Sequence, residues 1–130
     1  QWGNESYGAS QGFYSYSSSA TNINFVGGAA SGALYNGTFQ GTNRQFDWTY
    51  DGTNWKIYIN GSAVASGTSG TAVTRATDGL YFGCRHQNGG GNTQTDGNTA
   101  TLYLMQVYPA ALSASKILSD YNTNKSIYGI

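Results

Sequence analysis

The stretch VYPAALSASKILSDYNTNKSIYG, residues 107–129, is the one part of the chain whose pattern predicts a helix. Ser113 is a favourable N-cap, because its hydroxyl can accept a hydrogen bond from a backbone N–H of the first turn. Leu112 before it and Ile117 after it have the spacing of a hydrophobic staple, which fixes the angle at which the chain enters a helix. The sequence therefore predicts a helix that starts at Ser113.

The predicted helix is short and has one narrow apolar stripe, formed by Ile117, Leu118 and Tyr121. Asn122 and Asn124 are expected to end it. Just before the helix, ATLYLMQVY at residues 100–108 is apolar on both faces of a strand. Such a strand is usually central in its sheet and covered on its second face. We expect the helix to be that cover and to bury Tyr103.

Upstream, short runs alternate between apolar and polar residues, which is typical of strands buried on one face. The clearest are NINF (22–25), QFDWTY (45–50), WKIYIN (55–60) and GLYFGCR (79–85). Asp51–Gly52 and Asn60–Gly61 supply residues that tolerate the positive φ of tight hairpin turns. Residues 45–66 are therefore predicted to form a three-stranded antiparallel meander. Asn36–Gly37 indicates another hairpin or a bulge.

The composition limits the function classes. A chain of 130 residues is one domain's worth, with 9% charged residues, six basic against six acidic. Scattered basic residues do not form the cluster that phosphate binding needs, so a nucleic-acid partner is not expected. No apolar run approaches the roughly 20 residues needed to span a bilayer, so membrane insertion is not expected either. The single Cys84 cannot form an internal disulfide.

The ending TLYLMQVYPAALSASKILSDYNTNKSIYG (101–129) resembles that of laminin G-like, concanavalin A-like jelly rolls. WTYDGTNWKIYINGSAVASG (48–67) is similar to the central hairpin of that family, and GLYFGCR to the strand after it. The resemblance implies an all-β, concanavalin A-like (laminin G-like) antiparallel β-sandwich jelly roll with one short C-terminal helix, in one domain, residues 1–130. The variant ending DYNTNKSIYG (120–129) resembles structural proteins of tailed phages.

The sequence departs from that family in two motifs and at its start. Pro109–Ala110 replaces the usual Asn-Arg, and Lys116 replaces an acidic residue, which leaves Ser113 to cap the helix alone. The family's opening strands are missing, because Gln1 falls near the third. We expect the domain to be the C-terminal part of a larger chain, or to receive its closing strand from another chain.

Catalysis is not expected, although the resembled family includes glucanases and lyases. Glycoside hydrolysis needs two carboxylates that flank the scissile bond. Glu5 is the only glutamate, Asp47 should point away from the core face, and Asp51 should occupy a turn. His86 and Cys84 complete neither a catalytic triad nor a zinc site, and Cys84 should be buried and inert. The chain is predicted not to be an enzyme.

The best ligand-binding candidate is the polar segment at residues 86–98, predicted as a long loop. Its amides could hydrogen-bond sugar hydroxyls, and its oxygens could bind calcium, with Asp96 as a weak calcium candidate and no other cofactor expected. A plain glycine-rich surface loop is the alternative. The candidate ligand-binding residues are Tyr81, Arg85, His86, Asn88, Asn92, Asp96 and Asn98. Aromatic side chains on the strand faces opposite the strongest apolar residues either bind sugars or protein partners or form the second covered face of a sandwich. They are Tyr14, Tyr16, Tyr58, Tyr81 and Tyr103.

Two functions follow from the residues and the resemblance. The first is a non-catalytic structural, decoration or adhesion module on the surface of a phage particle, or outside a cell. It would contact other virion proteins or copies of itself. The alternative is a carbohydrate-binding, lectin-like module that recognises a cell-surface polysaccharide through the 86–98 segment and the tyrosines at the rim.

Overall fold

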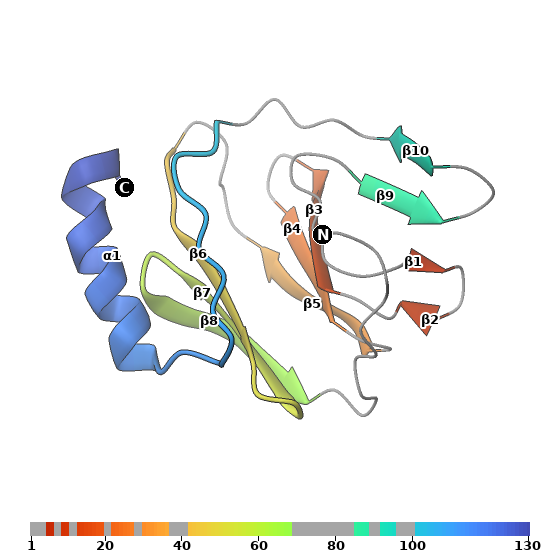
Figure 1. The fold of residues 1–130 in the computed structure, drawn as a ribbon, viewed down its shortest axis with the longest axis horizontal. Helices are drawn as coiled ribbons and strands as arrows, with labels where there is room; N and C mark the ends of the chain where they lie inside the picture. Colours follow the sequence, from red (N-terminus) through yellow and green to blue (C-terminus); the bar gives the residue numbers. More distant parts are fainter. Residues whose placement is uncertain are drawn as a thin grey trace.

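The computed structural model describes residues 42–68 and 101–130 in full, and elsewhere the backbone of strands at residues 5–6, 9–10, 13–19, 22–27, 30–36, 85–88 and 92–95. Every strand pairing among these residues is antiparallel, and one helix follows the strands at the C-terminus (Figure 1). An antiparallel fold that ends on a helix was predicted and is confirmed. Closure of the strands into a sandwich or a jelly roll stays a prediction.

The N-terminal half contains a two-stranded ladder and a three-stranded sheet. β1 (Glu5–Ser6) pairs with β2 (Ala9–Ser10), and the sheet has the order β3 (Phe13–Ser19), β4 (Asn22–Gly27), β5 (Ala30–Asn36). The strand predicted at 22–25 is β4. Asn36 is the last residue of β5, and the next described strand belongs to another sheet. Gly37 lies outside the described residues, so the hairpin or bulge at Asn36–Gly37 stays a prediction.

The predicted meander is confirmed as a second three-stranded sheet, formed by β6 (Phe46–Tyr50), β7 (Asn54–Ile59) and β8 (Ser62–Thr68). Its second turn has Asn60 at φ 50° and Gly61 at φ 77°, the two positive angles that a two-residue hairpin requires. β5 lies next to β8, so the two three-stranded sheets adjoin. The alternating pattern and the turn dipeptides were therefore sufficient to predict this part of the fold.

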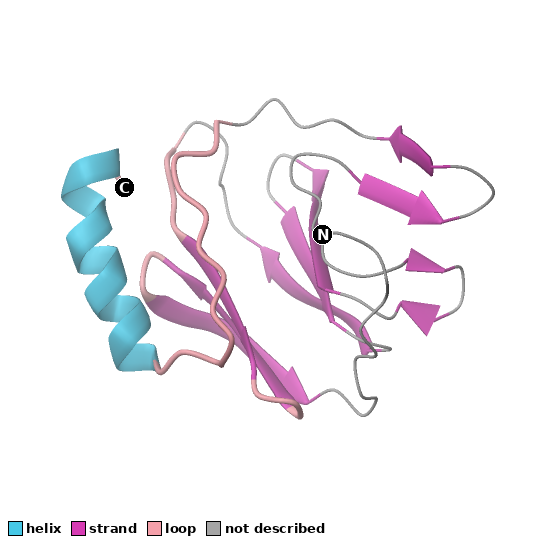
Figure 2. Ribbon diagram, in the orientation of Figure 1, coloured by secondary structure: helices cyan, strands magenta, loops and turns pink. Residues whose placement is uncertain are grey.

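The core of the described region is centred on β7, which is buried on both faces. Ile57, Tyr58 and Ile59 are 0%, 2% and 5% exposed. The sequence left open whether Tyr58 is exposed or lies on a second covered face, and its burial shows that the face is covered. Its face is covered by α1 (Ala114–Tyr128), which packs across the meander (Figure 2).

The contact between α1 and the meander is close at Gly61, in the turn between β7 and β8. A Cβ atom on Gly61 would lie 3.0 Å from the Leu118 side chain and 3.1 Å from that of Tyr121. Ile117, from the same helix, is fully buried. The absence of a side chain at residue 61 therefore lets the helix approach the sheet, and the predicted role of the helix as a cover is confirmed for this sheet.

Both ends of α1 are capped. The Ser113 hydroxyl accepts a hydrogen bond from the Lys116 backbone N–H at 3.2 Å, as predicted. The predicted stop at Asn122 and Asn124 is wrong, because the helix continues to Tyr128. Gly129 ends it in the left-handed conformation, φ 65°, with its N–H donating to the Lys125 carbonyl.

A central strand was predicted at residues 100–108, and its described part, residues 101–108, forms neither strand nor helix. The prediction that they lie under the helix is also wrong, since all eight are exposed, and Tyr103 is 56% exposed although its ring contacts Tyr128. Apolar residues on both faces indicate that a segment would be buried if it were a strand. They do not determine which neighbouring strand would pair with its backbone.

No helix within the described ranges is long and apolar enough to cross a membrane.

Replacing Gly67 by alanine should destabilise the meander. Gly67 pairs with Trp55, and a methyl group there would overlap the indole ring. Overpacking of this kind costs about 1–3 kcal/mol of unfolding free energy. We expect Gly67→Ala to lower the midpoint of urea unfolding and Ser66→Ala, its exposed neighbour, to leave it unchanged. Equal stability of the two variants would contradict this packing.

Candidate functional site

The predicted ligand-binding segment is a hairpin in its described part, not a long loop. Arg85, His86 and Asn88 lie in β9 (Arg85–Asn88), and Asn92 begins β10 (Asn92–Thr95). The prediction of a loop is therefore wrong for residues 86–88 and 92–95. Three of the candidate residues, Tyr81, Asp96 and Asn98, lie outside the described residues.

The hairpin brings candidate residues together through its register. Asn88 pairs with Asn92, and His86 pairs with Gln94. Alternation along paired strands places both pairs on one face of the ladder, and Arg85, with Thr95, on the other. The hairpin thus places His86, Asn88 and Asn92 on one polar face, where the sequence had indicated only a polar segment.

The calcium candidate lies outside the described part of the chain. Asp96, the weak calcium candidate, is not described. Among the described residues, no three His, Cys, Asp or Glu side chains gather in a group that could hold a metal ion. The calcium candidate stays a prediction.

A second feature is an exposed apolar surface on residues 102–108, which we call the apolar segment. Its exposed side chains are Leu102, Tyr103, Leu104, Met105, Val107 and Tyr108. No charged residue lies within the segment. Exposed apolar surface of this kind commonly marks a site of protein contact.

The apolar segment runs along β6, one of the two outer strands of the meander (Figure 1). Tyr103 lies with its ring centroid 5.9 Å from that of Tyr128, whose carbonyl accepts a hydrogen bond from Asn43, just before β6. Further along, Leu112 lines the same groove as Thr49, near the end of β6. Residues 103–112 therefore follow β6 from its beginning to its end, in the same direction.

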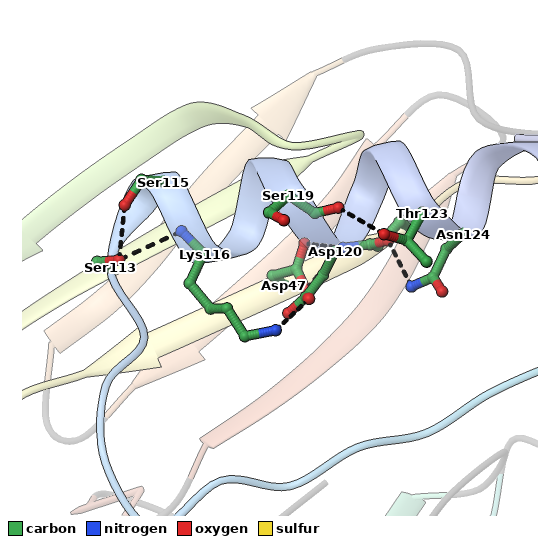
Figure 3. Close-up of polar contacts among 9 residues, drawn as sticks. Asp47, Ser113, Ser115, Lys116, Ser119, Asp120, Thr123 and Asn124 are labelled. Carbon is green, nitrogen blue, oxygen red and sulfur yellow. Dashed lines mark hydrogen bonds and ion pairs between the residues drawn. The ribbon is translucent and has the colours of Figure 1, made fainter.

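Two carboxylates lie near each other where α1 crosses the meander (Figure 3). Asp120 forms an ion pair with Lys116 on the helix. Asp47 accepts two hydrogen bonds from the Gln45 amide, at 2.9 and 3.1 Å. Burial and, to a smaller degree, the charge of Asp120 raise the pKa of Asp47, against the opposing effect of Gln45. Sequence reasoning missed this pair, because the helix brings Asp120 to β6 from 73 positions away.

A groove opens at the N-terminus of α1, which we call the N-terminal groove. It measures about 130 Å³. One wall is the β6–β7 hairpin and the other is the chain that enters the helix. The lining residues are Thr49, Asp51, Asn54, Lys56, Tyr58, Ala111, Leu112, Ser113 and Ala114.

Asp51 in this groove is a turn residue, as predicted. One carboxylate oxygen accepts hydrogen bonds from the backbone N–H groups of Thr53 and Asn54, at 2.9 and 2.7 Å. The other accepts one from the Asn54 side chain at 3.1 Å. The hydrogen bonds from Asn54, backbone first and then side chain, and from the Thr53 backbone lower the pKa of Asp51. Asp51 is therefore a fixed negative charge.

Comparison with known proteins identifies the family of the fold. The model of the concanavalin A-like lectin/glucanase superfamily matches residues 2–118. A 2.1 Å crystal structure of an S-layer domain-containing protein from Clostridium thermocellum ATCC 27405 is similar, with a TM-score of 0.52 and 16% sequence identity. The similarity covers 93% of this chain and 67% of that chain. No curated protein matches the sequence significantly.

Asp47 and Asp51 should have opposite effects on stability as pH changes. The raised pKa of Asp47 means that its ionisation, as pH rises through that value, costs stability in the folded state. Asp47→Asn should therefore raise the urea midpoint at pH 7, and the gain should vanish below the ordinary aspartate pKa, at about pH 3.

Asp51→Asn is the matched variant with the opposite sign. Its lowered pKa gives stability that is present above the ordinary aspartate value and is lost as pH falls through the folded one. The variant should therefore be less stable than the wild type at pH 7. Changes of the same sign in both variants would contradict the assigned environments.

Proposed function

The chain belongs to the concanavalin A-like lectin/glucanase superfamily, and within that superfamily we propose that it is a non-catalytic binding module. It works by protein–protein contacts. Its setting is the surface of a phage particle, where it serves as a structural, decoration or adhesion module. Its partners are other virion proteins or copies of itself. The observation that carries the proposal is the exposed apolar segment.

The apolar segment has the chemistry of a protein interface. It contains two tyrosines and a methionine, which are enriched in interfaces, and no Lys, Glu or Asp, which are depleted there. The chain's own helix leaves these side chains exposed. A neighbouring protein that covers the segment would remove this surface from water, and the apolar area buried would favour the association.

The setting rests on two further observations. The ending at 120–129 resembles structural proteins of tailed phages, and the chain is low in charge, with few Lys and Glu. The similar solved structure belongs to an S-layer domain-containing protein. We propose, by analogy with that protein's name, that this chain also lies at a surface.

The absence of catalysis is part of the proposal, and the described carboxylates support it. Asp51 is held by three hydrogen bonds in its turn. Asp120 is paired with Lys116, and Asp47 with the Gln45 amide, where the helix crosses the sheet. Neither Asp47 nor Asp120 lines the N-terminal groove.

A carbohydrate-binding module is the second candidate, and the β9–β10 hairpin favours it. Its register puts Asn88 opposite Asn92 and His86 opposite Gln94, so four polar residues share one ladder face. Amide and imidazole groups are suited to hydrogen-bonding sugar hydroxyls. This candidate and the first are compatible in one surface protein.

Self-association or binding to virion proteins should depend on the apolar segment. Val107 is 67% exposed, and Val107→Glu would place an unpaired charge in the proposed interface, which costs free energy on burial. We expect the variant to associate at least about 10-fold more weakly, measured by sedimentation velocity of the chain alone and with virion proteins. Ile127→Glu is the matched control, because Ile127 is 64% exposed but lies in α1. Equal loss in both variants, or no association of the wild type, would contradict the proposal.

A glycan array, probed with calcium and then with a chelator, tests the second candidate. Competable binding that Asn88→Ala and Asn92→Ala abolish would support a sugar site on the hairpin. A blank array for a folded sample would leave the protein-contact function without a competing carbohydrate function.

A further inference from the structure

We propose that the N-terminal groove is a binding site for a carboxylate, either of a small organic acid or of an acidic sugar. The site consists of Lys56, Tyr58 and the first backbone N–H groups of α1. It is separate from the apolar segment, so it goes beyond the contact function proposed above.

The buried hydroxyl of Tyr58 is the observation that points to a ligand. Tyr58 is 2% exposed and lines the groove. Its side chain has no hydrogen-bond partner in the described structure, although its burial removes it from bulk water. Buried polar groups in folded proteins are nearly always hydrogen-bonded, so an orphan hydroxyl needs a specific explanation. An acceptor that enters the groove would provide the missing partner.

The helix N-terminus adds donors of the same kind. Ser113 caps the Lys116 N–H through its hydroxyl, and its carbonyl accepts from the Ile117 N–H at 3.1 Å. The N–H groups of Ala114 and Ser115 donate to no acceptor among the described residues. The first turn contains no acidic side chain to offset the positive end of the helix dipole. Free N–H groups and a helix dipole that no acidic side chain of the first turn offsets favour an anion at this position.

Lys56 supplies a full positive charge. Its side chain is exposed and forms no ion pair with any described carboxylate, although it lines the groove. Its amino group can donate to an anion without first breaking a salt bridge. With Tyr58 and the helix, the groove therefore presents donors from both of its walls.

Asp51 and the apolar wall decide which anion fits. The three hydrogen bonds of the turn occupy the Asp51 carboxylate and keep it ionised, so the groove also contains one negative charge. Repulsion from that charge disfavours a doubly charged phosphate and leaves a singly charged group favoured. Ala111, Leu112 and Ala114 offer apolar contacts for carbon atoms, which suits an organic carboxylate.

The test is an NMR titration of the full, ¹⁵N-labelled chain with three probes: acetate, methyl glucuronide and methyl glucoside. The two sugars share a ring and differ in the carboxylate. We expect the carboxylates to shift the amide resonances of Ala114 and Ser115, and the glucoside to leave them in place. Tighter binding of the glucuronide than of acetate would identify an acidic sugar, and equal binding a free acid.

Two variants and one control locate the site. Lys56→Gln should weaken glucuronide binding about 3- to 10-fold, and Tyr58→Phe about 2- to 10-fold, the range for one hydrogen bond. Lys125→Gln removes a lysine near the other end of α1 and should bind as the wild type does. Wild-type affinity in Lys56→Gln, or equal response to glucoside and glucuronide, would overturn the proposal.

Tyr58→Phe provides a second readout that needs no ligand. Removing an unpaired buried hydroxyl relieves a desolvation cost, so the unliganded variant should melt at or above the wild-type temperature. The stabilisation by methyl glucuronide should then be smaller in the variant than in the wild type. A lower melting temperature without ligand would show that the hydroxyl already has a partner inside the protein, which overturns the proposal.

Discussion

The close packing of α1 against the β6–β8 meander is the constraint on which the described structure depends. Gly61 lets Leu118 and Tyr121 approach the turn between β7 and β8, and a side chain there would push the helix away. Side-chain amides fix the helix further, from Asn124 to Gln45 at 3.3 Å and from Asn43 to the last turn. Burial of Tyr58, the raised pKa of Asp47 and the N-terminal groove all follow from that position.

Features that depend on neighbours in sequence were predictable. The turn at Asn60–Gly61 needs two residues with positive φ, and the dipeptide itself reveals that need. Ser113 caps its helix through a contact three residues away. The family was also identified from the ending and the central hairpin, and the match over residues 2–118 confirms it. Distant contacts were harder, because residues 101–108 have the pattern of a strand but no paired backbone.

In the candidate sites, too, local features were predictable from the sequence and distant contacts were not. The polarity of residues 85–95 was visible in the sequence, but their pairing as a hairpin was not, because the run of three glycines resembles a loop. Tyr58 alternates with Ile57 and Ile59, and the sequence left open whether its face is exposed or covered. Only the docked helix shows that this face is covered, and only then do Lys56 and Ala114 line one groove. A site built from two distant segments has no local signature.

The apolar segment and the N-terminal groove share one stretch of backbone. Tyr108 ends the segment, and Ala111 and Leu112, just after Pro109, line the groove. The stretch has no strand ladder, so contacts at its ends position it: Tyr103 against Tyr128 at one end, and the entry into α1 at the other. Both of these contacts are made with α1, near its two ends. The packing of α1 on the meander therefore positions the surface for a protein partner together with the groove for a small anion.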